Sequence, residues 1–200
     1  MGETPSLYAV LMRTCERPIV SSMAAVVLIG YRGSGKTTVG RLLAARLGRT
    51  FVDCDEVIVA RHGKSIREIF ADGGEEAFRR LEAAAIAELA GKADHIIAVG
   101  GGAISRKENR EALANHFIVY LRAEPRALLK RIQSDPGSSD NRPNLTSLGG
   151  GIEEIEALLG QREPIYRAAM NAELDVTELS PQQVAERIAE MISRESKSTR

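Results

Sequence analysis

One segment near the beginning of the chain restricts the possible folds more than any other feature. Its sequence, Gly30-Tyr31-Arg32-Gly33-Ser34-Gly35-Lys36-Thr37, matches every fixed position of the phosphate-binding pattern G-x-x-x-x-G-K-[ST]. The apolar run 25–29 precedes it, and apolar side chains recur at helical spacing from Val39 to Leu47. A strand, a glycine-rich turn and a helix in that order direct backbone N–H groups and the positive end of the helix toward phosphate oxygens. The segment therefore predicts a nucleoside-triphosphate site.

The side chains of this loop are suited to bind both phosphate and metal. We expect Lys36 to reach the β- and γ-phosphates as a mobile point charge, and the Thr37 hydroxyl to coordinate a Mg²⁺ ion that bridges them. The predicted ATP contacts in this part of the chain are Gly33, Ser34, Gly35, Lys36, Thr37 and Thr38.

The composition indicates one globular domain without the features of a nucleic-acid or membrane protein. The 200 residues are 44% hydrophobic, which is enough for a sizeable core. Lys and Arg number 27, Asp and Glu also number 27, and only 4% of residues are aromatic, so neither charge nor base stacking favours nucleic acid or a membrane. Cys15 and Cys54 offer neither a disulfide framework nor paired metal-ligand spacing. We therefore expect a protein of the reducing cytoplasm, and we predict a monomer.

Sequence periodicity divides the chain into three parts. Residues 1–22 lack sustained periodicity and include Pro5 and Pro18, so we expect a disordered N-terminal extension there. Residues 23–192 carry the periodic patterns of the folded domain. Residues 193–200 are polar, and we expect this tail to fray.

Short apolar runs alternate with longer helical patterns through the folded domain. The expected strands are Ala25–Ile29, Thr50–Asp53, His95–Val99, Phe117–Leu121 and Leu174–Val176. The expected helices are a short one opened by a capping box of Ser65 and Glu68, and longer ones at residues 75–90, 126–132, 153–169 and 181–192. This βαβα alternation predicts an α/β fold, in which helices cover both faces of a parallel sheet and ligands lie at the carboxyl ends of the strands.

Two carboxylates follow the second expected strand, at the sheet edge where ligands bind. Asp53 and Asp55 are two residues apart, so strand periodicity is expected to direct both side chains to the same side. We expect one to support Mg²⁺ and the other to contact an acceptor hydroxyl and take its proton. The alternative is a polar strand end without a function, and the phosphate loop favours the functional interpretation.

Three glycines, Gly100, Gly101 and Gly102, follow the strand expected at residues 95–99. Glycines at such a position let a ligand approach the backbone closely, although glycine clusters are also ordinary turns. Many P-loop NTPases carry an acidic pair after such a strand, and this chain has none there. The metal support is therefore expected from Asp53.

Three arginines suit a small anionic substrate or a transferring phosphoryl group. Arg79 lies near the start of the helix expected at 75–90, and Arg162 opens the segment Arg162-Glu163-Pro164-Ile165-Tyr166. Taken alone, each of these two could be a solvated surface arginine, as most arginines are. A carboxylated substrate, however, would need a guanidinium fork of this kind. Residues 133–151 are rich in Ser, Asp, Pro and Gly, which predicts a mobile lid that carries Arg142 as an arginine finger.

Together and in this order, these motifs resemble those of the shikimate kinase family. The resemblance spans residues 23–192 and comprises Gly30-x-x-Gly33-x-Gly35-Lys36-Thr37, Asp53-x-Asp55, Phe78-Arg79, Gly100-Gly101-Gly102, Arg142-Pro143 and Arg162-Glu163-x-x-Tyr166. It implies transfer of the ATP γ-phosphoryl group to the 3-hydroxyl of shikimate, within aromatic amino-acid biosynthesis. It also implies a three-layer P-loop kinase fold with five parallel strands in the order 2-3-1-4-5 and a mobile lid.

The resemblance also implies roles for individual residues. Shikimate would be bound by Asp55, Arg79, Gly100, Gly101, Gly102 and Arg162, with the two arginines gripping its carboxylate. Thr37 and Asp53 would hold Mg²⁺, and Arg131 would lie against the adenine of ATP. Arg142 would act from the lid on ATP, and the catalytic residues would be Lys36, Asp55 and Arg142.

Three alternatives share the phosphate loop. A related kinase, such as a gluconate kinase, would phosphorylate a different polyol, and the set of Asp55, Arg79 and Arg162 argues against it. A GTPase switch would normally need an Asn-Lys-x-Asp motif, which the sequence lacks. A nucleotide-binding module without turnover is disfavoured by the presence of Asp53, Asp55 and Arg142.

Overall fold

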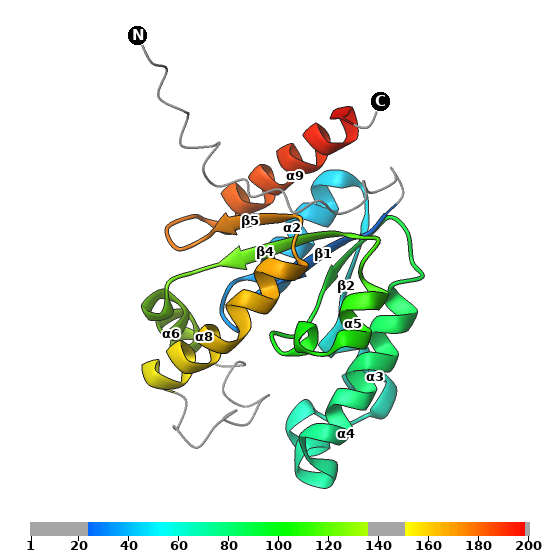
Figure 1. Cartoon of the computed structure of the whole chain (residues 1–200), viewed down its shortest axis with the longest axis vertical. Coiled ribbons are helices and arrows are strands. Elements are labelled where there is room, and N and C mark those ends of the chain that lie inside the picture. Colours follow the sequence, from blue (N-terminus) through cyan, green and yellow to red (C-terminus); the bar gives the residue numbers. More distant parts are fainter. Residues whose placement is uncertain (1–23, 136–150, 199–200) are drawn as a thin grey trace.

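The computed structural model describes residues 24–135 and 151–198, which form an α/β structure around one parallel sheet (Figure 1). The five strands are β1 (Val26–Ile29), β2 (Thr50–Asp53), β3 (His95–Ala98), β4 (Phe117–Arg122) and β5 (Ala172–Asp175). They pair in the order β2-β3-β1-β4-β5, and every pairing is parallel. The strand order implied by the resemblance is confirmed.

Helices connect the strands and cover both faces of the sheet. They are α2 (Lys36–Leu47), α3 (Cys54–His62), α4 (Ile66–Leu89), α5 (Lys107–Ala112), α6 (Pro125–Ser134), α8 (Ile152–Ala169) and α9 (Pro181–Ser198), with a 3₁₀ turn η1 (Ala103–Ser105). In Figure 1, α9 lies at the top of the view, whereas α3 and α4 extend below the sheet. Within the described ranges, no helix is both long enough and apolar enough to cross a membrane.

The core has two layers because side chains alternate across the central strand. Val26 and Leu28 of β1 pack into one layer with side chains of α2, α6 and α9. Val27 and Ile29 face the other layer, which contains side chains of α3 and α4. All four residues are at most 1% exposed, as expected for a strand buried on both faces. The sheet thus holds the carboxyl end of β1, where the phosphate loop begins, in a rigid position.

The α4 helix contains a break where the sequence predicts two separate helices. Its first residues are fixed by the predicted capping box, in which the Glu68 backbone N–H donates to Ser65 Oγ at 3.2 Å and the Ser65 backbone N–H donates to Glu68 Oε2 at 2.7 Å. Gly74 has φ 72° and ψ −177°, a conformation that side-chained residues rarely adopt. The helix resumes at Glu75, and this second part includes Arg79 among its buried residues.

The structure corrects the predicted position of Asp55. Strand β2 ends at Asp53, and α3 begins at Cys54, so Asp55 lies in the first turn of a helix that the sequence analysis missed. The Asp53 side chain caps that helix, because its Oδ1 accepts a hydrogen bond from the Asp55 backbone N–H at 3.0 Å. The argument from strand periodicity was therefore wrong.

The structure also changes two predicted boundaries. Helix α9 continues to Ser198, so residues 193–198 are helical and are not a frayed tail. Helix α6 continues to Ser134, into the region predicted as the start of the lid. The first 22 residues, Arg142 and most of the predicted lid lie outside the described residues.

Candidate active site

A cavity of about 570 Å³ lies at the carboxyl ends of the strands. It is lined by the phosphate loop, by the segments that follow β2 and β3, and by the segment between β5 and α9. Its lining includes Gly33, Ser34, Gly35, Lys36, Thr37, Thr38, Asp53, Asp55, Gly100, Gly101 and Arg131. The structure thus collects in one cavity residues that the sequence predicted for nucleotide, metal and acceptor.

The phosphate loop owes its shape to glycine. Gly30, Gly33 and Gly35 have φ values of 146°, 80° and 89°, all in the region that disfavours side-chained residues. Gly35 is the N-cap of α2, and a glycine has no side chain that could satisfy the first N–H groups of the helix. The first N–H groups of a helix can bind an anion at this position, which is how helix N-termini bind phosphate.

Lys36 lies folded back over the loop. Its Nζ donates hydrogen bonds to the carbonyl oxygens of Gly30 and Tyr31, each at 2.9 Å. Both acceptors belong to the loop, so the ammonium group lies against the loop that would bind phosphate. A phosphate would offer stronger, charged acceptors to the same ammonium group.

Thr37 and Asp53 form a pair of oxygen ligands suited to a hard cation. The Thr37 hydroxyl donates to Asp53 Oδ2 at 2.7 Å. In residues 24–135 and 151–198, no cluster of three or more His, Cys, Asp or Glu side chains could hold a metal alone. Mg²⁺ characteristically takes one or two protein oxygens and completes its shell with phosphates and water, so this donor set fits that ion.

A smaller pocket of about 20 Å³ adjoins the large cavity. Its lining consists of Tyr31, Arg32, Phe70, Phe78, Arg79, Gly101, Gly102 and Arg162. Arg32 and Gly101 line both spaces, so a ligand in the small pocket would lie next to the phosphate loop. Helices α4 and α8 bring together Arg79 and Arg162, which are far apart in the sequence.

Arg79 is held by two carboxylates on its own helix. Glu82 Oε2 accepts from Arg79 Nη1 at 2.6 Å, and Glu75 Oε1 accepts from Nη2 at 3.0 Å and from Nε at 3.2 Å. Burial alone would lower the pKa of the Arg79 guanidinium, but the two carboxylates outweigh it and raise that pKa. Burial raises the pKa of the Glu82 carboxyl, and Arg79 offsets that effect only in part. Neither glutamate was singled out from the sequence, although the i+3 and i−4 spacings from Arg79 were available signals.

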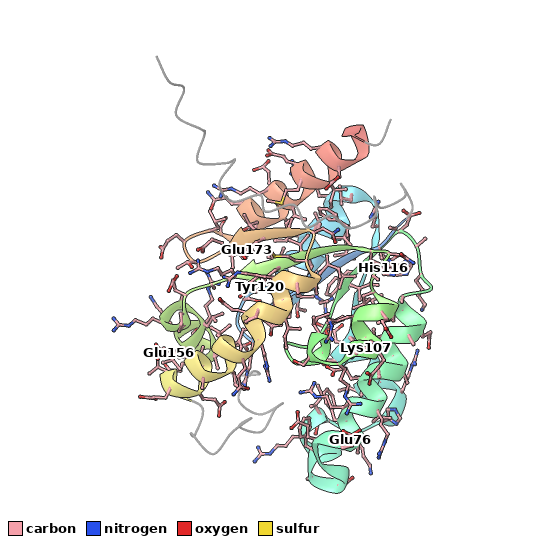
Figure 2. The ribbon with its side chains drawn as sticks, viewed as in Figure 1. Glu76, Lys107, His116, Tyr120, Glu156 and Glu173 are labelled. Carbon is pink, nitrogen blue, oxygen red and sulfur yellow. The ribbon has the colours of Figure 1, made fainter. Side chains whose placement is uncertain are left out.

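The segment from Arg162 to Tyr166 attaches α8 to the sheet. The Tyr166 hydroxyl donates to the Gly101 carbonyl oxygen, and its ring centroid lies 5.0 Å from that of Tyr120 on β4. The Tyr120 hydroxyl, labelled in the centre of Figure 2, donates to Glu163 at 3.1 Å. Burial raises the pKa of Tyr166 to about 12, so this phenol remains a hydrogen-bond donor at neutral pH. These contacts fix the helix from which Arg162 reaches the small pocket.

The opposite end of the large cavity is apolar and includes residues that the sequence analysis missed. Its lining there includes Val176, Leu179, Pro181 and Val184. Arg131 closes this end, because its Nη2 donates to the carbonyl oxygens of Val176 at 2.7 Å and Thr177 at 2.9 Å. These residues follow β5, so the rule that ligands bind beyond the carboxyl ends of parallel strands was the signal that could have found them.

A phosphate loop, a hydroxyl–carboxylate pair beside it and an adjoining arginine pocket define a P-loop phosphotransferase that uses ATP and acts on a small molecule. The family model for shikimate kinase matches residues 32–193. The chain therefore belongs to the shikimate kinase family, and it is an ATP-dependent phosphotransferase with shikimate kinase activity.

Individual relatives agree with this assignment. A shikimate kinase of Symbiobacterium thermophilum is 43% identical over 84% of this chain and 95% of its own length. The structure of shikimate kinase from Acinetobacter baumannii in complex with shikimate shares 34% sequence identity with this chain. The match covers 86% of this chain and 94% of that protein, with a TM-score of 0.80. A gluconokinase from Sinorhizobium meliloti covers 88% of this chain and 95% of its own with a TM-score of 0.59, but at 16% identity it shows a likeness of fold alone.

Proposed function

We propose that this site transfers the γ-phosphoryl group of ATP to the 3-hydroxyl of shikimate, giving shikimate 3-phosphate and ADP. The observation that carries the proposal is that Arg79 and Arg162 meet in a small pocket that opens onto the phosphate loop. Two guanidinium groups in a confined space select a carboxylate, and the adjoining loop supplies the phosphoryl donor.

ATP occupies the large cavity in this proposal. Its phosphates lie against the backbone of residues 33–38 and the Lys36 ammonium, and its adenine lies at the apolar end beside Arg131. The cavity of about 570 Å³ is large enough for a nucleotide-sized ligand. Lys36 stabilises the charge that develops on the transferring phosphoryl group.

Thr37 and Asp53 would hold Mg²⁺ through the Thr37 hydroxyl and the Asp53 carboxylate. Bound there, the ion neutralises charge on the β- and γ-phosphates. The 2.7 Å contact between the two side chains supports this assignment, because it places the two oxygens next to each other, as two ligands of one ion would be.

The carboxylate of shikimate enters the smaller pocket between Arg79 and Arg162, and its ring lies outside that pocket, along the Gly100–Gly102 backbone toward the large cavity. Asp55, which lines the large cavity beside Gly101, orients the 3-hydroxyl and accepts its proton. Arg142 lies outside the described residues, and its predicted action on the phosphoryl group remains a prediction from the sequence. So do the monomeric state and the cytoplasmic location.

A substrate assay tests the reaction. ADP release should be followed with Mg-ATP and either shikimate, gluconate or no acceptor. Release that depends on shikimate supports the proposal, and equal release with gluconate would contradict it.

Binding measurements test the carboxylate clamp. Shikimate and ATP affinities should be measured by calorimetry for Arg162→Ala and for Arg79→Met combined with Glu82→Gln, since removing Arg79 alone would leave the buried Glu82 carboxylate unpaired. Each charge-assisted contact is typically worth about 1.5–3 kcal/mol, so shikimate binding should weaken by about tenfold or more while ATP binding is retained. Arg80→Ala is the matched control, because this neighbouring arginine is exposed. Unchanged shikimate binding in both clamp variants would overturn the acceptor assignment.

A further inference from the structure

Two carboxylates share the guanidinium of Arg79, and their surroundings differ sharply. Glu82 is fully buried at 0% exposure, so its ion pair with Nη1 belongs to the protein interior. The Glu75 side chain is 62% exposed, although the same residue spans the Nε–Nη2 edge of the guanidinium. One ion pair is thus shielded from solvent, and the carboxylate of the other is accessible to it.

The edge that Glu75 spans is one at which a guanidinium receives a carboxylate. Nε–H and Nη2–H point the same way and form a fork for one or two carboxylate oxygens. Arg79 also lines the small pocket, so a ligand carboxylate there would meet a guanidinium whose charge is already divided between two glutamates. A third carboxylate must either replace Glu75 at this edge or bind beside it against its negative charge.

We propose that Glu75 is a built-in competitor of the acceptor carboxylate and thereby a residue that sets acceptor affinity in this site. The inference rests on the proposed function, because it takes Arg79 as the anchor for a carboxylated acceptor. Glu75 occupies the carboxylate-binding edge of Arg79, and it withdraws to solvent when the acceptor binds. Small anions without a second contact to Arg162 gain too little from Arg79 to displace it, so the same residue favours ligands that reach both arginines.

The local structure makes this exchange easy. Gly74 breaks α4, so Glu75 opens the second part of the helix, one turn before Arg79. Only the Arg79 partner of this i,i+4 pair is buried, and solvent screens the Glu75 carboxylate, so the pair contributes less to stability than the buried pair of Arg79 and Glu82. Glu75 can therefore leave without disturbing the buried pair of Arg79 and Glu82.

The test compares two adjacent glutamates. Glu75→Gln removes the competing charge and keeps the size of the side chain. Glu76→Gln is the matched control. Glu76, labelled on α4 in Figure 2, is also exposed, but its ion pair is with Arg106 and not with Arg79. Shikimate and ATP dissociation constants should be measured by calorimetry for both variants and for the parent.

We expect Glu75→Gln to bind shikimate about two- to fivefold more tightly, the range that corresponds to the loss of one charge that is largely screened by solvent. ATP affinity should stay at the parent value, and Glu76→Gln should match the parent for both ligands. Equal or weaker shikimate binding in Glu75→Gln would overturn the inference, because it would mean that Glu75 orients Arg79 or has no influence on the ligand.

A further variant separates this outcome from a failure of the proposed function. In protein that carries Arg79→Met and Glu82→Gln, adding Glu75→Gln should no longer change shikimate affinity. If the Arg79 variant binds shikimate as the parent does, the acceptor assignment itself is wrong. If that variant binds weakly but Glu75→Gln in the parent brings no gain, only the competitor role is wrong.

Discussion

The guanidinium of Arg79 lies so close to Gly102 that a side chain at position 102 would collide with it. A Cβ atom on Gly102 would lie 2.5 Å from Nη2 of Arg79 and 2.9 Å from its Cζ. Gly102 has φ −92° and ψ −10°, which any residue can adopt, so glycine is required there for space and not for its conformational freedom. The last glycine of the three thus shapes the arginine pocket.

Gly102→Ala should therefore weaken shikimate binding by about tenfold or more, because Arg79 must move and its charge-assisted contact is lost. ATP binding should be retained, since Gly102 does not line the large cavity. Calorimetry with both ligands checks this. Gly160→Ala is the control, because a Cβ atom at this position in α8 meets no atom within 4 Å. This variant should bind both ligands as the parent does and should be slightly more stable.

Lys36→Met should lower the rate of phosphoryl transfer by about a thousandfold, while the protein remains folded. The variant loses the charge that stabilises the transferring group and also the two hydrogen bonds to Gly30 and Tyr31. Single-turnover kinetics and circular dichroism measure the two effects. Lys64→Met, which removes an exposed lysine paired with Asp72, should behave as the parent, and near-normal turnover in Lys36→Met would refute the phosphate-loop mechanism.

Arg131→Ala should raise the KM for ATP by about tenfold and leave shikimate affinity nearly unchanged. The variant loses the hydrogen bonds to Val176 and Thr177 and with them the support of the apolar end of the cavity. Steady-state kinetics with each substrate varied in turn checks the prediction. Lys130→Ala on the same helix is exposed and serves as the control; an equal change in both variants would count against a specific role for Arg131.

Protonation of His116 should make the fold less stable under mildly acidic conditions. This residue, labelled in Figure 2, is 7% exposed, and its Nε2 lies 3.0 Å from the Ala90 carbonyl oxygen. Burial lowers the pKa of His116 below its usual range, and the bond to Ala90 offsets this only in part. The unfolded chain therefore takes up a proton at a higher pH than the folded protein, so stability falls as pH drops through the unfolded pKa toward the folded one.

Urea unfolding of the parent and of His116→Gln at pH 7.5 and pH 5.5 checks this sign. The parent should lose more stability than the variant over that interval, because the other ionisable groups are common to both proteins. An identical loss would show that His116 titrates alike in the folded and unfolded states.

The sequence predicted most elements of the fold because their determinants are local. The strands at residues 25–29 and 95–99 were placed to within one residue, since each is a short apolar run bounded by turn residues. Helix α3 escaped the analysis because its first turn begins directly at the end of β2, and two acidic residues there resembled a polar strand end. The hydrogen bond from the Asp55 N–H to Asp53 identifies Asp53 as the cap of this helix.

The sequence by itself determined the phosphate loop, the layered class of the fold and the kinds of side chain that the site would use. Each of these depends on contiguous residues, whose spacing dictates backbone geometry directly. Tertiary structure alone decided that Arg79 and Arg162 face one pocket, that Gly102 leaves room for the Arg79 guanidinium, and that Glu82 is buried whereas Glu75 is exposed. Such relationships depend on how α4 and α8 pack across the sheet and on which carboxylate is buried, and neither is specified by the local spacing of residues.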